Sequence, residues 1–244
     1  MTDAAATAPS ASKERTWGLG DVAAGVVLSI VASQIVLGIV LAASGRTSDQ
    51  ADDLPLSLIA VTQLGLWVGL LGVPLLATAR KGNGLVADLR LRIRWPDVWV
   101  GGGIGIALQV VVLPLLYWPL LELLDKATSD LEEPARDIID RADGPIGVIL
   151  LVLIVGIGAP IIEEIFYRGL LQGALVKRGL HPALAIGIGA TIFGFSHFEP
   201  IQTPALIIFG AVAGVLYHRS GRLGPAIAAH VAFNMVTVVA LLAS

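Results

Sequence analysis

Long apolar segments dominate the sequence and recur at the length needed to cross a lipid bilayer. Seven candidate spans run approximately over residues 22–43, 56–79, 98–121, 146–176, 182–198, 204–217 and 223–242. With 55% hydrophobic and only 14% charged residues, the chain is too apolar for a water-soluble domain. We therefore predict an all-α fold, a polytopic bundle of about seven transmembrane helices.

The N-terminal residues differ from the rest of the chain in composition. Residues 1–16 are rich in Ala, Thr and Ser, which predicts a disordered cytoplasmic tail. The apolar run that follows exceeds the roughly 7 to 15 residues of a signal-peptide core, so we expect a retained helix rather than a cleaved signal. Residues 17–244 are then a single transmembrane domain, without a soluble domain.

The positive charges of the connecting loops predict an orientation, because cytoplasmic loops carry an excess of Lys and Arg. With the N-terminus inside, the cytoplasmic pieces hold Lys13, Arg15, Arg80, Lys81, Arg90, Arg92, Arg94, Lys177, Arg178, Arg219 and Arg222. The outer pieces hold only Arg46, Lys126, Arg136 and Arg141, together with most of the acidic residues. The sequence thus predicts a multi-pass cell-membrane protein with a cytoplasmic N-terminus and an extracytoplasmic C-terminus.

Three segments depart from simple membrane spans. The outer connection over residues 125–145 is strongly acidic, which indicates a solvated loop, with a short surface helix after Pro134 as the alternative. The span over 146–176 is longer than the roughly 30 Å hydrocarbon core requires, so it must tilt, kink or protrude, and residues 156–160 are where a break would fall. The fifth and sixth spans are short, so their turn at 199–203 is expected to stop below the outer surface and leave room for water.

The costliest feature of the sequence is a group of charges inside the fourth span. Glu163, Glu164 and Arg168 lie within six residues of one another in an apolar segment. An ionisable side chain at mid-bilayer costs roughly 2.5 to 3.5 kcal/mol even on lenient scales, so the three need pairing, water or a function. Glu164 and Arg168 are spaced i, i+4 and can pair on one helix face, whereas Glu163 is rotated away. Glu163 is therefore the unpaired carboxylate.

Two later spans carry imidazoles. His197 follows Phe193 by four residues, and Asn234 follows His230 by four, so each pair lies on one helix face. A single membrane histidine is most simply an interhelical hydrogen-bond partner, but separate structural explanations for all these polar groups are improbable together. We predict that they share one cavity. The single amides Gln34, Gln63 and Gln109 are interpreted instead as interhelical hydrogen-bond partners.

Such a cavity can hydrolyse a bond without a serine or cysteine nucleophile, and the chain contains no cysteine. Glu163 beside an imidazole can take a proton from water, while an imidazole and an amide stabilise an oxyanion. The alternative is a metal site, in which Glu163, His197 and His230 would hold a divalent ion such as zinc. The cofactor is therefore left open between a divalent metal and none.

Three motifs in order resemble the signature of the CPBP family, the CAAX protease and bacteriocin-processing membrane proteins, also called the Abi family. These are Glu163-Glu164-Ile165-Phe166-Tyr167-Arg168-Gly169, Phe193-x-x-x-His197 and His230-x-x-x-Asn234. The resemblance covers residues 146–242, which would form the catalytic core. It implies an intramembrane endopeptidase similar to the type II CAAX prenyl endopeptidases, either a glutamate-type or a metal-dependent enzyme.

Residue by residue, the resemblance implies that Glu163 and His197 activate the water and that His230 and Asn234 form the oxyanion site. In the same scheme Glu164 and Arg168 support the first motif. The family also includes bacteriocin self-immunity proteins, so a non-catalytic binding or regulatory protein of the membrane is the alternative function.

Arg is more frequent than Lys, and Ala, Gly and Val are abundant. This amino-acid usage is typical of proteins encoded by GC-rich bacterial genomes. Processing of prenylated eukaryotic proteins is then not expected. The expected partners are a bacterial membrane protein or peptide as substrate and membrane lipid, and no nucleic acid.

Overall fold

A computed structural model describes residues 14–243 and is helical throughout its regular structure, with no strand in this part of the chain. The helices are α1 (Leu19–Ser44), η1 (Ser48–Asp53), α2 (Leu56–Leu70), α3 (Gly72–Lys81), α4 (Leu85–Asp88), α5 (Trp95–Ala107), η2 (Leu108–Val112), α6 (Leu113–Leu124), α7 (Thr128–Ile139), α8 (Gly144–Leu151), η3 (Val152–Gly158), α9 (Ala159–Glu164), η4 (Ile165–Gln172), α10 (Gly173–Lys177), α11 (Pro182–Phe195), α12 (Thr203–Ser220) and α13 (Gly224–Leu242). The predicted all-helical class is confirmed.

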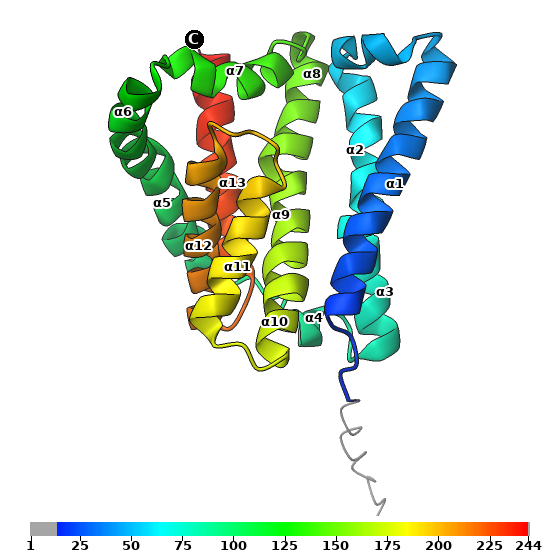
Figure 1. Ribbon diagram of the computed structural model, residues 1–244, viewed down its shortest axis with the longest axis vertical. Coiled ribbons are helices and arrows are strands. Elements are labelled where there is room, and N and C mark those ends of the chain that lie inside the picture. The colour runs from blue at the N-terminus through cyan, green and yellow to red at the C-terminus, as the bar shows by residue number, and fades with distance from the viewer. Residues whose placement is uncertain (1–13, 244) are drawn as a thin grey trace, which may run out of the picture.

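Several of these helices join into longer rods, which correspond to the predicted spans. Within the described residues, five rods are long and apolar enough to cross a membrane: Leu19–Ser44, Leu56–Lys81, Trp95–Leu124, Gly144–Lys177 and Gly224–Leu242. The two other predicted spans are the helices α11 and α12, which form a shorter hairpin on the front of the bundle (Figure 1). The chain is therefore a multi-pass membrane protein.

Proline marks where many of these helices begin. α8, α11, α12 and α13 each have a proline within their first two residues, where its missing N–H leaves no intrahelical bond unmade. α12 ends at Ser220, and the next residue, Gly221, has a φ of 66° that favours glycine, so the chain turns there into α13. These local signals set the lengths of the C-terminal helices.

The rod over Gly144–Lys177 lies at the centre of the bundle and runs its full height (Figure 1). The rod has no break at residues 156–160, the place where one would fall, and it contains two π-helical stretches, η3 and η4. A π-helical turn keeps the axis continuous while it rotates the side chains that follow, and such turns are frequent at functional sites. All side chains of η4 are buried.

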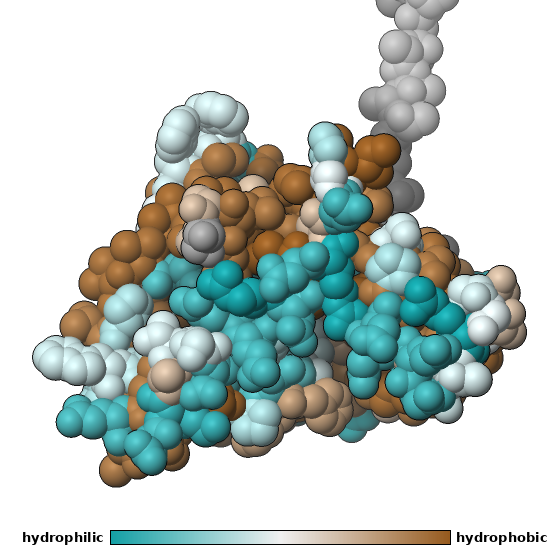
Figure 2. All heavy atoms as spheres, turned by 90° about the horizontal axis from the view of Figure 1, so that it is seen from above, coloured by the Kyte–Doolittle hydropathy of each residue, from teal (hydrophilic) through white to brown (hydrophobic). Residues whose placement is uncertain are grey.

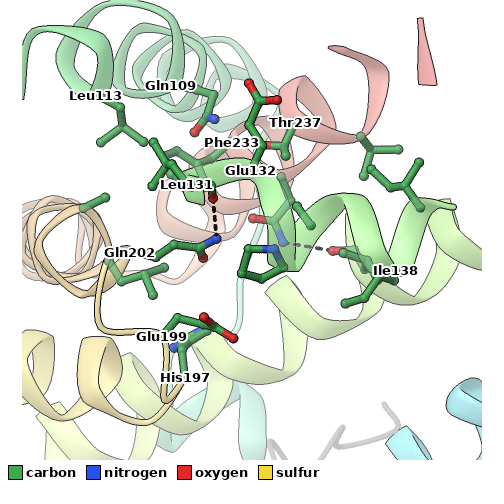
Figure 3. Close-up of a pocket in the computed structure, with 18 of the residues that line it drawn as sticks. Gln109, Leu113, Leu131, Glu132, Ile138, His197, Glu199, Gln202, Phe233 and Thr237 are labelled. Carbon is green, nitrogen blue, oxygen red and sulfur yellow. Dashed lines mark hydrogen bonds between the residues drawn. The ribbon is translucent and has the colours of Figure 1, made fainter. Parts of the chain in front are cut away.

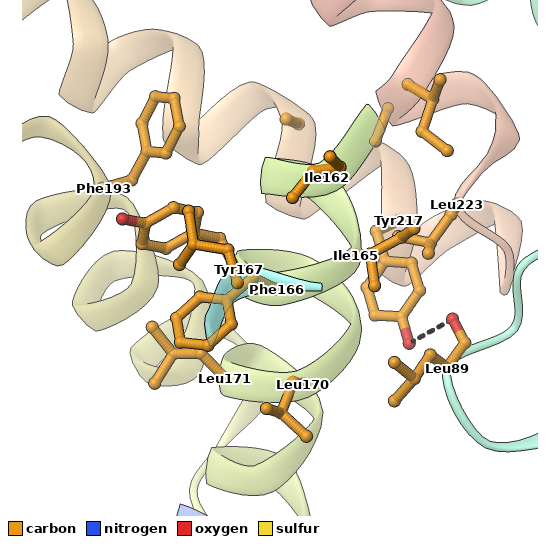
Figure 4. Packing of buried hydrophobic residues seen from close by; sticks show 14 of the residues in the cluster. Leu89, Ile162, Ile165, Phe166, Tyr167, Leu170, Leu171, Phe193, Tyr217 and Leu223 are labelled. Carbon is orange, nitrogen blue, oxygen red and sulfur yellow. Dashed lines mark hydrogen bonds between the residues drawn. The ribbon is translucent and has the colours of Figure 1, made fainter. Parts of the chain in front are cut away.

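The hydrophobic core surrounds the lower part of this central rod. Phe166 and Leu170 are almost completely buried and pack with Phe193 of α11, Tyr217 of α12 and Leu89 of the loop after α4 (Figure 4). The Tyr217 hydroxyl donates a hydrogen bond to the Leu89 carbonyl at 3.5 Å. The core thus fixes the central rod against the α11–α12 hairpin.

At the top of the bundle in Figure 1, α7 lies across the ends of the other helices. The acidic connection is therefore an amphipathic helix, longer than the short helix considered after Pro134, and Pro134 lies inside it. The expectation of a simple solvated loop is wrong, because Ile138 and Ile139 pack against Leu151 and Val238 beneath them. Seen from this end, hydrophilic residues form a band across the bundle with hydrophobic residues on either side (Figure 2).

The predicted disordered tail, residues 1–16, lies largely outside the described residues. Of its last residues, Arg15 forms an ion pair with Asp88 at 3.0 Å, and the Thr16 amide donates to the Lys81 carbonyl at 2.8 Å. α1 begins at the end of the bundle opposite to the C-terminus (Figure 1).

Candidate active site

The central rod supplies the three charged residues of the first motif, and it directs them to two different environments. Glu164 and Arg168 are 0% and 2% exposed and point into the protein interior. Glu163 precedes them and lines a cavity, with 17% of its side chain exposed. The predicted separation between a paired and an unpaired glutamate is thus visible in the structure.

Glu164 accepts two short hydrogen bonds at one carboxylate oxygen. Arg168 Nη1 and His230 Nδ1 each lie 2.8 Å from Glu164 Oε1. Arg168 also donates to the Gly210 carbonyl at 3.3 Å, and its guanidinium lies 4.4 Å from the centroid of the Phe193 ring. The ion pair predicted from the i, i+4 spacing is formed, and it extends to a histidine on α13 that the spacing could not reveal.

Glu163 lies between the two imidazoles. Its Oε2 atom is 4.0 Å from His197 Nε2 and 3.8 Å from His230 Nε2. Both distances are too long for a direct hydrogen bond, and a polar separation beyond about 3.5 Å has room for a bridging water. Three polar atoms from α9, the segment after α11 and α13 therefore converge on one small volume.

Each imidazole is oriented by the hydrogen bond of its other nitrogen. His197 Nδ1 lies 2.8 Å from the Phe193 carbonyl, and His230 Nδ1 is held by the Glu164 carboxylate. Because a carbonyl and a carboxylate can only accept, the Nδ1 atom carries a hydrogen in both rings. The Nε2 atoms of both histidines therefore face Glu163.

Asn234 lies one helical turn after His230 and lines the same cavity. Its Nδ2 atom donates to the Val155 carbonyl at 2.9 Å. The amide has two N–H groups, so one remains for another acceptor. The fourth predicted catalytic residue is thus held in place with a free donor.

The cavity has a volume of about 1380 Å³, and Leu131, Glu132 and Ile138 of α7 line it (Figure 3). Residues of α2, α6, α7, α12 and α13 form its walls, which are mainly apolar. Three acidic residues, Glu122, Glu132 and Glu199, also line it. Gln202, before α12, donates to the Leu131 carbonyl of α7 at 3.0 Å (Figure 3). The turn between α11 and α12 therefore ends below α7, as its short helices predicted, and leaves space above the site.

Sequence reasoning missed one polar contact behind the site. The Tyr167 hydroxyl donates to Ser196 Oγ at 2.8 Å, and Ser196 donates in turn to the Phe193 carbonyl at 2.8 Å. The same carbonyl also accepts the hydrogen bond from His197 Nδ1. Tyr167 lies inside the first motif and Ser196 directly before the histidine of the second, so adjacency to the motifs was the available signal.

A metal ion would need three or more ligands grouped together. In the part of the chain that the structure describes, no group of three His, Asp or Glu side chains is arranged to hold a metal ion. Glu163, His197 and His230 are the nearest to such a set, with Glu163 Oε2 at 3.8 Å from His230 Nε2 and 4.0 Å from His197 Nε2. Two ligands of one zinc ion, each about 2.0 to 2.2 Å from it, stand at comparable separations, so these are the residues that would hold a divalent ion.

Comparison with known proteins agrees with the motifs. Residues 145–236 match the family model described as type II CAAX prenyl endopeptidase Rce1-like. No curated protein and no solved structure gives a significant match. The family resemblance inferred from the three motifs is confirmed, and the match falls on the helices α8 to α13 that build the site.

Proposed function

We propose, from the premise that residues 145–236 match the type II CAAX prenyl endopeptidase Rce1-like family model, that the chain is an intramembrane endopeptidase acting through a glutamate-activated water. One observation carries this proposal. The Glu163 carboxylate lines an apolar cavity and stands 4.0 Å from His197 Nε2 and 3.8 Å from His230 Nε2, with room for a water between them.

The proposed reaction begins with a water molecule between Glu163 and His197. Glu163 takes a proton from the water as the water oxygen bonds to the carbonyl carbon of the substrate. The resulting oxyanion accepts hydrogen bonds from the free Asn234 N–H and from His230 Nε2–H, for which His230 carries protons on both nitrogens. The C–N bond then breaks, and Glu163 returns the proton to the leaving amine.

Glu164 and Arg168 act behind these residues. Glu164 holds His230 through Nδ1, and Arg168 neutralises Glu164 in a region that excludes water. Neither residue lines the cavity. We propose that they position the oxyanion histidine and take no direct part in proton transfer.

The proposed substrate is a bacterial membrane protein or peptide. The cavity walls are mainly apolar, and the chain is embedded in the membrane, so a substrate that arrives within the bilayer meets the site without crossing water. The sequence composition favours a bacterial source, in which prenylated CAAX proteins are not expected.

Replacement of Glu163 by Gln tests the reaction directly. Glutamine keeps the size and hydrogen-bonding capacity of the side chain but cannot take a proton, so cleavage should fall by at least about 10²- to 10⁴-fold. The measurement is a comparison of cleaved membrane proteins by mass spectrometry in cells carrying wild type or Glu163→Gln, with His181→Gln as a control outside the cavity.

A binding or immunity protein would behave differently. Its cellular effect would survive Glu163→Gln in folded protein, because binding does not need the base. Full retention of the cellular phenotype in that variant would falsify the catalytic proposal.

We propose that the water is activated without a metal. Removing divalent ions with EDTA should then leave the rate of cleavage unchanged in purified protein. If EDTA abolishes cleavage and zinc restores it, a divalent ion bound by Glu163, His197 and His230 is required instead.

We also propose that the N-terminus is cytoplasmic and the C-terminus extracytoplasmic. The ends of α3 and α7 lie at opposite ends of the bundle (Figure 1), and the Lys and Arg residues gather at the α3 end. Reporter fusions after Lys81 and after Asp130 should therefore report opposite sides of the membrane, and activity of one reporter at both positions would overturn the orientation.

A further inference from the structure

Gln109 is a polar residue that neither the fold nor the proposed reaction uses. It lies in the π-helical stretch η2, between α5 and α6, and its side chain lines the cavity close to Leu113, Phe233 and Thr237 (Figure 3). The predicted role was an interhelical hydrogen bond. The structure gives its Oε1 atom no hydrogen-bond partner among the described residues, although that atom is buried.

Two other glutamines of the chain show what a structural amide looks like. Gln172 is buried, and its Nε2 atom donates to the Gly214 carbonyl of α12 at 3.2 Å. Gln202 donates to the Leu131 carbonyl at 3.0 Å. Both join two elements of the fold, whereas Gln109 joins none.

An amide without a hydrogen-bond partner inside a membrane helix lowers the stability of the fold. A buried polar group without a partner costs about 1 to 3 kcal/mol, and a polar side chain inside a membrane helix calls for a partner or a function. A π-helical turn adds a further sign, because such turns are frequent at functional sites. Because the Gln109 side chain lines the cavity, a partner group for this amide can reach it from there.

The chemistry of the amide indicates what that group is. A carboxamide offers one acceptor and two donor hydrogens and no charge, which matches the N–H and C=O of a peptide main chain. A rotation of half a turn about the last side-chain bond exchanges the oxygen and nitrogen positions, and this torsion is soft. The cavity of about 1380 Å³ exceeds the roughly 300 to 1,000 Å³ of typical small-molecule sites, so it has room for several residues of a chain.

We propose that Gln109 binds the main chain of an extended peptide segment in the cavity and so acts as a substrate-binding residue. This inference rests on the proposed function for the cleavage of that peptide, but the binding itself does not require cleavage. An extended segment exposes its main-chain groups, whereas an intact helix has already paired them. Gln109 therefore selects for a segment that is unwound where it passes η2.

The test measures peptide binding in protein that cannot cleave. In the Glu163→Gln background, Gln109→Leu is compared with Gln34→Leu, the same replacement on α1 at an exposed position outside the cavity. The probe is a decapeptide of alternating Leu and Ala with a terminal lysine tag, together with a series in which each main-chain N–H in turn is N-methylated.

Gln109→Leu should weaken binding of the parent peptide by about 2- to 10-fold, the value of one hydrogen bond. One N-methylated peptide should bind correspondingly weaker to the Gln109 protein but lose nothing further in Gln109→Leu. Gln34→Leu should bind as the parent protein does. The melting temperature of Gln109→Leu should be unchanged or higher, because an unpaired buried group has been removed.

The inference would be overturned if Gln109→Leu bound the peptide as tightly as the parent protein with Gln109, or if neither of these two proteins bound it. A lower melting temperature of Gln109→Leu would overturn it as well. These outcomes are separate from the failure of the proposed function. The proposed function would fail if the wild-type protein cleaved no peptide or membrane protein, even though peptide binding still depended on Gln109.

Discussion

The N-terminal and C-terminal halves of the bundle are held together by different means. α1 and α2 meet through small residues, and a Cβ added at Gly65 would lie 2.8 Å from Ser33 Cα. The C-terminal helices instead join through buried charge, with Glu164 bound to Arg168 and to His230 on another helix. Close packing of small residues suffices for helices that only span the membrane. Ions buried between membrane helices are retained at a cost, and Glu163, the charged neighbour of this pair, lines the cavity.

The largest expected effect comes from breaking the buried ion pair. Arg168→Ala leaves the Glu164 carboxylate without its cation in a region closed to water, at a penalty of about 3 to 5 kcal/mol. The variant should lose folded yield and melting temperature in detergent, and it should be inactive. Glu163→Gln, in contrast, should be inactive at unchanged or higher stability, because Glu163 has no ion-pair partner within its own helix.

A matched control lies in the N-terminal half. Lys81 pairs with Asp21 at 2.6 Å, a shorter separation than the 2.8 Å of Arg168 and Glu164, but the Lys81 side chain is 51% exposed. Lys81→Ala should therefore cost only about 0 to 1 kcal/mol. If Glu163→Gln were less stable than Arg168→Ala, Glu163 would be the true partner of Arg168 and the assignment of the base would be wrong.

The next effect concerns the contact between the halves. Gly105 of α5 packs directly on the backbone of Ala229, the residue before His230, so an added Cβ would overlap the Ala229 carbonyl. Gly105→Ala should destabilise by about 1 to 3 kcal/mol through overpacking, and it should also lower activity by displacing His230.

Gly103 lies on the same helix, and nothing lies within 4 Å of a Cβ placed there. Gly103→Ala should be neutral or slightly stabilising, since alanine is the better helix former. Thermal unfolding of both variants in detergent checks the pair. Equal melting temperatures would show that α13 does not depend on close approach of α5.

The smallest effect sharpens the description of the site itself. Tyr167→Phe removes only the hydroxyl that donates to Ser196, and one such bond contributes about 0.5 to 1.5 kcal/mol. Because Ser196 and His197 share the Phe193 carbonyl, kcat should fall a few-fold while KM stays constant. Ser196→Ala should give a similar loss, and the double variant should not add the two losses in full. A change in KM alone would assign Tyr167 to substrate binding.

The fold class and the identity of the polar residues could both be predicted from the amino-acid pattern. Apolar segments of spanning length can only be membrane helices, because every backbone polar group in lipid must be paired within the chain. The i, i+4 spacing of Glu164 and Arg168 predicted their ion pair, since helix geometry alone brings such side chains together. The three motifs likewise marked Glu163, His197 and His230 without any knowledge of their distances.

How these residues meet could not be predicted in this way, because it depends on the packing of separate helices. The spacing within each helix does not give the relative depths of His197 and His230 in the bundle. Both Nε2 atoms lie within 4.0 Å of Glu163, because the level at which helices cross depends on the packing between them. Two other features also depend on the packing between helices: the hydrogen bond between His230 and Glu164, and the absence of a hydrogen-bond partner for Gln109 Oε1 among the described residues. Each depends on which atom of another helix lies opposite, and the spacing within one helix carries no information about that.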